Sequence, residues 1–159
     1  MEQLVESVEK LLHAETGTMV MRLELANLQY ELQTIDVPAL REELRDAQEE
    51  YEQELDVLSN LLNLFAPTRY RRGVIDVDRR LGRALQDVMT ARAGKEIAFN
   101  RWRRGKLRAE NLTNMISAAE TELVNVQAVE QITREDCYAP ILELARVYTS
   151  SRSRANSRG

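Results

Sequence analysis

The chain has 159 residues, of which 43% are hydrophobic, 30% are charged and 5% are aromatic, with a formal net charge of −4. One cysteine, Cys137, and one histidine, His13, exclude an internal disulfide and a zinc site of clustered Cys and His ligands. With only six Gly and three Pro, the composition favours helices over a turn-rich sheet.

The ends and the hydropathy of the chain bear on its compartment. The first residues contain no basic segment followed by an apolar one, so no secretory signal is predicted. No stretch approaches the roughly 18 apolar residues that a membrane-spanning helix needs. We therefore expect a soluble protein of the cytoplasm or nucleus, which is not secreted and has no transmembrane segment.

The first predicted helix covers about residues 1–36. Its apolar residues Met21, Leu25 and Leu28 alternate steps of four and three, the spacing of a coiled-coil contact line. Glycine disfavours helix, and a break or frayed turn is expected near Gly17. Pro38 should end this pattern because proline disfavours helix at the residue before it.

The second helix is predicted over 38–65, with Asp36 as its N-terminal cap. A turn at 66–73 separates it from the longest predicted helix, 74–134, which keeps one unbroken 4-3 register of mostly apolar and small residues and contains no proline. Within that helix, Gly94 and Gly105 are the expected points of a kink or split.

Near the C-terminus the sequence changes character. Pro140 is expected to end the long helix and to precede a short amphipathic helix over 139–149. Residues 150–159 are rich in Ser and Arg and poor in apolar residues, so a disordered tail is predicted there. The helical part, 1–149, is predicted to be a single domain.

Charge is distributed in blocks of opposite sign. Residues 1–65 carry a net charge of −11, residues 66–110 carry +8, residues 111–150 carry −4, and the tail carries +3. Folding back at 66–73 would place residue i opposite about residue 139 − i, and so set the acidic helix 40–65 beside basic residues. The predicted fold is therefore all-α, either an elongated antiparallel coiled-coil hairpin or a helical bundle with long helices. A compact bundle broken at Gly17, Pro38, Gly94 and Gly105 would keep the same contact lines.

The predicted helix–helix interface consists of the larger residues on the 4-3 contact lines. These are Leu25, Leu28, Leu32, Leu58, Leu62, Leu81, Val88, Trp102, Leu112, Ile116 and Leu123. Further apolar residues lie off these lines, and a two-helix hairpin buries only one stripe per helix. They are Leu12, Met19, Leu23, Leu61, Leu64, Ile75, Leu85, Ile97, Met115 and Val129. This surplus predicts an additional partner for the helices.

Basic residues suggest contacts of a second kind. Aromatic and basic residues alternate over 99–108, a pattern that can bind phosphates and stack bases. The helical spacing favours the other interpretation, in which Phe99 and Trp102 are core and the arginines pair with acidic neighbours. Candidate contacts to phosphate or to an acidic partner are Arg69, Arg71, Arg72, Arg101, Arg103, Arg104, Arg152 and Arg154.

Catalytic and cofactor signals are weak. His13 has no second His or Cys near it in the sequence, and the acidic run 46–54 lacks the Glu-x-x-His pattern of di-iron bundles. There is no glycine-rich phosphate loop. We expect no enzyme activity, catalytic residue, metal, cofactor or small-molecule substrate.

Two functions remain as hypotheses. The favoured one is a non-catalytic coiled-coil subunit that associates with itself or with other coiled-coil proteins through helix–helix contacts, without a role at membranes. The alternative is a nucleocapsid-like protein that binds nucleic acid through the basic block 66–110 and the Ser/Arg tail. An acidic pI near 5.2 argues against this alternative, since nucleic-acid-binding domains are often strongly basic.

Overall fold

The computed structural model describes residues 2–65 and 74–156, with side chains described over 4–64 and 78–149. Three helices make up this part of the chain: α1 (Glu2–Gln33), α2 (Val37–Phe65) and α3 (Val74–Asn156). The described residues contain no strand, which confirms the all-α prediction. The predicted turn at 66–73 lies outside the described residues.

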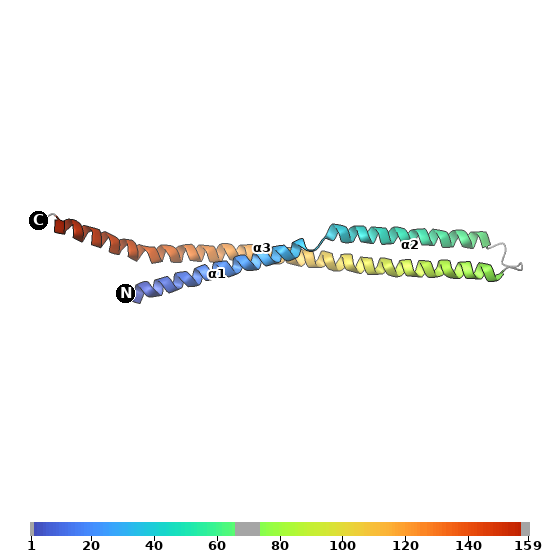
Figure 1. The fold of residues 1–159 in the computed structure, drawn as a ribbon, viewed down its shortest axis with the longest axis horizontal. Helices are drawn as coiled ribbons and strands as arrows, with labels where there is room; N and C mark the ends of the chain where they lie inside the picture. The colour runs from blue at the N-terminus through green and yellow to red at the C-terminus, as the bar shows by residue number, and fades with distance from the viewer. Residues whose placement is uncertain (1, 66–73, 157–159) are drawn as a thin grey trace. The chain divides into compact units, whose positions relative to one another are not determined.

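The chain divides into two compact units. One unit consists of residues 1–32 and 112–159, and here α1 packs along the C-terminal part of α3. The other consists of residues 33–111, and here α2 packs along the N-terminal part of α3 (Figure 1). Each unit is thus built on a pair of helices, and α3 contributes to both. The single-domain assignment of 1–149 stays a prediction.

The junction between α1 and α2 follows the predicted chemistry. Asp36 lies just before α2, and its Oδ1 accepts a hydrogen bond of 2.9 Å from the backbone N–H of Ala39. That bond satisfies one of the N–H groups that have no partner within a helix, which is the role of an N-terminal cap. Pro38 is tolerated because it lies in the first turn, where its missing N–H is not needed.

The break expected near Gly17 is absent, since α1 runs continuously from Glu2 to Gln33. One glycine inside a helix costs about 1 kcal/mol relative to alanine, which long flanking helices outweigh. The hydroxyls of Thr16 and Thr18 bond to the carbonyl oxygens of Leu12 and Ala14, at 2.7 and 3.2 Å, and are therefore satisfied within the helix. The helix α3 likewise passes through Gly94 and Gly105. The breaks expected at Gly94 and Gly105 are therefore absent, and the all-α helical bundle is built from long unbroken helices.

The prediction of separate helices 74–134 and 139–149 is also wrong, because α3 continues through Pro140 to Asn156. Proline removes one backbone hydrogen bond, but the Leu, Glu, Ala and Arg residues that follow it are good helix formers. Figure 1 shows α3 bending away from α1 towards this end, as helices commonly do at proline. Residues 150–156, predicted to be disordered, extend the helix by adding one backbone bond per residue.

Candidate helix–helix interfaces

In the unit of residues 33–111, α2 and α3 run antiparallel at close range. A Cβ atom placed on Gly105 would lie 2.5 Å from Cδ1 of Leu40, so this glycine allows α2 to approach α3 closely. Arg101 Nη1 donates a hydrogen bond of 2.9 Å to Oε1 of Glu43, as part of an ion pair. From the first contact to the second, the residue number rises on α2, from Leu40 to Glu43, and falls on α3, from Gly105 to Arg101. The two helices therefore run in opposite directions.

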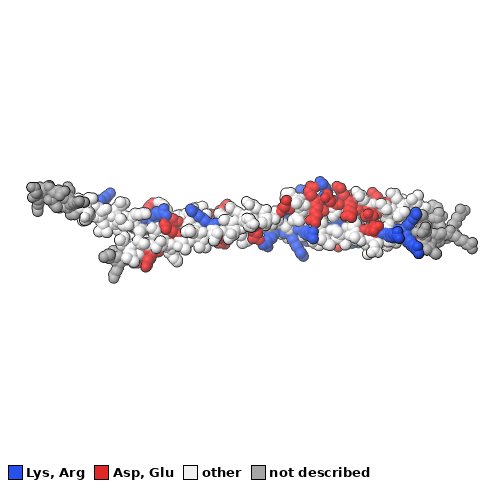
Figure 2. All heavy atoms as spheres, in the orientation of Figure 1, with Lys and Arg blue, Asp and Glu red and all other residues white. Residues whose placement is uncertain are grey.

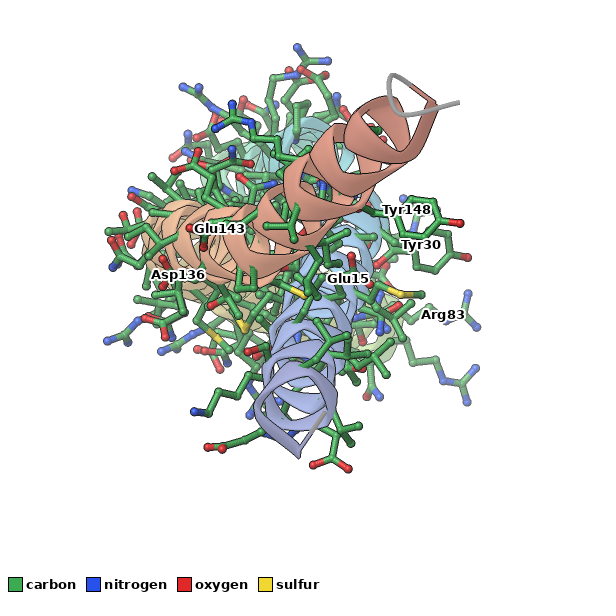
Figure 3. All side chains as sticks on the ribbon, turned by 90° about the vertical axis from the view of Figure 1, so that its left-hand side faces the viewer. Glu15, Tyr30, Arg83, Asp136, Glu143 and Tyr148 are labelled. Carbon is green, nitrogen blue, oxygen red and sulfur yellow. The ribbon has the colours of Figure 1, made fainter. Side chains whose placement is uncertain are left out.

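In the other unit, α1 and α3 are antiparallel as well. A Cβ atom on Gly17 would lie 3.7 Å from Cγ1 of Val126, an ordinary packing distance. Arg134 Nη2 donates to Oε1 of Glu15 at 3.0 Å and to Oε1 of Glu130 at 2.7 Å. Figure 3 labels Glu15 on α1, viewed along the helices. This partly buried network joins the two helices through one guanidinium group.

These contacts define the register of both helix pairs. In an antiparallel pair the numbers of two facing residues have a nearly constant sum, and for the four facing pairs described above this sum lies between 143 and 149. The predicted hairpin register corresponded to a value near 139, so the facing residue is shifted by about one and a half helical turns in the α2–α3 pair and by about one to three turns in the α1–α3 pair. An error of that size is expected, because the contact line repeats almost every half heptad and several neighbouring registers preserve it.

Small residues dominate the buried line of α3. Ala84, Ala91 and Ala98 follow one another at seven-residue intervals, and each is nearly inaccessible to solvent. Gly105 continues the same interval. Short side chains at every seventh position allow two helices to lie close together, because the backbone of one fits against the surface of the other.

The predicted interface residues differ in burial. Val88 and Leu112 are buried. Half-buried positions are Leu25, Leu28, Leu32, Leu58, Leu81, Trp102, Ile116 and Leu123. Leu62 remains 43% exposed. The individual contacts of these residues stay predictions, while their burial is typical of residues on one edge of a helix pair.

The aromatic and basic segment 99–108 of α3 has some residues in contact with α2 and others exposed to solvent. The rings of Phe99 and Trp102 are 5.9 Å apart between centroids, and Nζ of Lys106 lies 5.6 Å from the Trp102 ring centroid. Trp102 is half-buried, but Phe99 remains 44% exposed and is therefore not a core residue. Arg101 pairs with α2 as described, whereas Arg103 and Arg104 are exposed.

Opposite charges meet less completely than the sequence predicted. Lys95 lies over the ring of Tyr51, with Nζ 4.9 Å from the centroid, and Arg92 pairs at 3.4 Å with Glu96 of its own helix. Arg79, Arg80 and Arg83 are exposed and have no ion-pair partner among the described side chains. Figure 2 shows acidic side chains gathered along α2 and basic ones along α3. Each helix therefore keeps a strongly charged outer surface.

The other predicted basic contacts cannot be compared with this arrangement. Arg69, Arg71 and Arg72 lie outside the described residues, and so do the side chains of Arg152 and Arg154.

A second apolar line runs along the exposed side of α1. We name it the outer stripe, and its members are Leu12, Met19, Leu23, Ala26 and Tyr30, all of them exposed. Met19 and Tyr30 are 70% and 71% accessible, and Figure 3 shows Tyr30 projecting outward from α1. Leu12, Met19 and Leu23 were predicted from the sequence to be surplus apolar residues, whereas Ala26 and Tyr30 were not. The seven-residue step from Leu23 to Tyr30 was the signal that could have identified Tyr30.

The outer stripe has the spacing of a coiled-coil contact line. Counting Thr16 between Leu12 and Met19, its positions follow steps of four and three over residues 12–30. The line that packs against α3 includes Met21, Leu25 and Leu28, which are half-buried. Two such lines on one helix are typical of a helix that contacts more than one neighbour.

Within the described residues, His, Cys, Asp and Glu side chains form no group of three or more that could hold a metal ion. His13 is exposed and borders a shallow groove between α1 and α3, whose lining includes Glu6, Lys10 and Val129. There the pKa of the Glu6 carboxyl is lowered, chiefly because Lys10 donates a hydrogen bond to it. Cys137 is a buried free thiol.

Among the described helices, none has a stretch that is both long and apolar enough to cross a membrane. Comparison of the chain with models of protein families, with curated proteins and with solved structures finds no match.

Proposed function

We propose that this chain is a non-catalytic structural protein, an elongated antiparallel coiled-coil subunit that joins a larger assembly through helix–helix association. The observation that carries the proposal is the outer stripe of α1, which combines coiled-coil spacing with exposure of all its large apolar side chains. Water disfavours a continuous apolar line of this kind, at about 25 cal/mol for each Å² left uncovered. Burial against another helix removes that cost.

The proposed partners are other coiled-coil proteins or further copies of this chain. An amphipathic helix lying along the outer stripe would place its own apolar residues between Met19, Leu23 and Tyr30. Few residues of charged type flank the central part of the stripe: between Met19 and Tyr30 these are Arg22 and Glu24. Contact there would therefore bury little charge, which favours association.

The test is affinity purification of the full chain from its source cell, with nuclease treatment and mass spectrometry. We expect a stoichiometric, nuclease-resistant set of helical proteins. The double variant Met19→Glu/Leu23→Glu should reduce their recovery at least about tenfold, because it places two carboxylates in an apolar contact. Val20→Glu, also exposed but off the stripe, is the control and should retain them. Equal recovery with both variants would contradict the proposal.

A second candidate function is nucleic-acid binding, and a specific observation favours it. Arg79, Arg80 and Arg83 are exposed at one end of α3 and lack an ion-pair partner among the described side chains. Such groups bind phosphates with an affinity that falls as salt rises. We expect, on this alternative, that single-stranded RNA binds at low salt and that changing the three arginines to Gln weakens binding. Absence of binding at low salt in a fluorescence anisotropy titration excludes it.

A further inference from the structure

A groove runs between α2 and α3 on one side of the unit of residues 33–111. It is open to solvent and has a volume of about 600 Å³, and it is lined by Leu44 and Gln48 of α2 together with Lys95 and Phe99 of α3. Seven-residue steps stay on the same edge of a helix in a coiled coil. Such steps place Leu55 and Leu62 on the same edge of α2 as Gln48, and Arg92 and Leu85 on the same edge of α3 as Phe99.

Most residues on these two edges, which border the groove, are apolar and accessible. Leu55, Leu62, Leu85 and Phe99 are all exposed, at 37% to 51% of their full accessibility. The half-buried apolar residues of α2, such as Leu40, Ala47 and Leu58, lie on the neighbouring edge that faces α3. The apolar face of α2 is therefore wider than one helix can cover, as in helices that face the core of a bundle.

The two helices carry opposite charge. Residues 37–65 contain eight acids and two bases, and residues 74–111 contain five acids and ten bases. Any occupant of the groove must therefore present a basic surface to α2 and an acidic surface to α3 at the same time. A second copy of this chain presents both surfaces, already held at the correct spacing.

We propose that a second copy of this chain docks on the groove, so that two α2–α3 pairs form an antiparallel four-helix bundle. This inference rests on the proposed function and specifies one partner. Two twofold arrangements bring the grooves face to face. With the twofold axis parallel to the helices, each α2 lies against the α3 of the other copy, and opposite charges meet. With the axis perpendicular to them, α2 meets α2 and like charges meet. Charge complementarity selects the first arrangement.

The selected arrangement predicts one intermolecular ion pair. Because α2 and α3 are antiparallel, facing residues have numbers with a constant sum, as for Glu43 and Arg101. Moving nine residues along each helix from this pair gives Glu52 and Arg92, which therefore lie at the same height along the helix pair. Both side chains are exposed. Glu52 lies about one helical turn from Gln48 and from Leu55, and Arg92 lies seven residues before Phe99, so both border the groove side of the helix pair. In the dimer, Glu52 of each copy lies beside Arg92 of the other copy, and the twofold axis repeats the pair.

The first measurement is the mass of the full chain in solution by sedimentation equilibrium. We expect twice the 18.3 kDa of one chain. Leu55→Glu/Leu62→Glu should raise the dissociation constant at least about tenfold, because charge enters the apolar contact of an acidic helix. Val57→Glu/Leu64→Glu changes exposed residues on the other edge of α2 and should leave the mass doubled. Unchanged helical circular dichroism verifies that both variants remain folded.

The second measurement tests the orientation by charge exchange. Glu52→Arg alone and Arg92→Glu alone should each dimerise more weakly than the original chain. A mixture of the two variants should form heterodimers, because both intermolecular pairs then join opposite charges. Under the rejected arrangement, Glu52→Arg would instead pair preferentially with the unaltered chain, and that result would overturn the proposed geometry.

Failure of this inference is separable from failure of the proposed function. A chain that is monomeric at tens of micromolar, or a dimer unaffected by Leu55→Glu/Leu62→Glu, overturns docking at the groove. If helical partners are still recovered through the outer stripe of α1, the proposed function stands without it. If neither dimer nor partner is found, both proposals fail.

Discussion

Substituting Leu112 by alanine is expected to lower the free energy of unfolding by about 2–5 kcal/mol. Leu112 is 4% accessible, and it has the largest side chain among the buried apolar residues of the described chain, the others being Ala, Val and Cys. Its truncation removes three carbon atoms from the contact and leaves either a cavity or a local collapse. Helix pairs have few other large buried residues to compensate for that loss. Urea unfolding followed by far-UV circular dichroism measures the change.

The matched control for this variant is Leu107→Ala on the same helix. Leu107 is 51% accessible, so the substitution makes the same chemical change, with the same gain in helix propensity, outside the packed contact. Its effect should stay within about 0.5 kcal/mol of zero. Equal losses at residues 107 and 112 would show that burial at Leu112 contributes nothing beyond local helix formation.

The helices themselves could be largely predicted from the sequence, because apolar spacing and capping are local properties. The second helix was predicted over 38–65 and is found over Val37–Phe65, with Asp36 capping it. The predicted helix breaks at Gly17 and Pro140 were wrong, because they took account of the single helix-breaking residue and not of the long helix on either side of it. Propagation of a long helix adds a bond at every residue, so α1 and α3 continue through those positions.

The candidate interfaces were predictable only in part. Leu12, Met19 and Leu23 could be recognised as surplus because they lie off the main contact line. The exposure of Phe99 and Leu62 could not be predicted. Periodicity places a residue on one face of a helix, but it does not say how much of that face the neighbouring helix covers. This width of the covered face decides which residues form a groove.

Charge pairing shows a similar limit of the sequence. The helix 40–65 was predicted to neutralise the basic residues of the long helix, yet Arg92 bonds with Glu96 of its own helix and Arg45 with Glu42. Residues three or four apart in a helix are always within reach, whereas a pair between helices must order two long side chains. Each exposed pair contributes only about 0.2–1 kcal/mol. Block charges therefore favour an orientation without fixing individual partners.

Substituting Ala98 by leucine is expected to lower the free energy of unfolding by about 1–3 kcal/mol, although leucine and alanine are both good helix formers. Ala98 is 5% accessible and belongs to the seven-residue series of small residues on α3. Three added carbon atoms must therefore displace α2 or adopt a strained rotamer.

The control is Ala93→Leu, which adds the same atoms to an exposed position of α3 and should change stability by less than about 0.5 kcal/mol. Both variants are compared by urea unfolding, and the difference between them isolates overpacking from helix propensity. A second observable is the ion pair of Arg101 with Glu43, three residues from Ala98 along α3. If leucine separates the helices there, adding Glu43→Gln should cost less in Ala98→Leu than in the original chain. Equal stability of the two leucine variants would mean that small residues are not required on this line, and that α2 and α3 are held together by their larger neighbours.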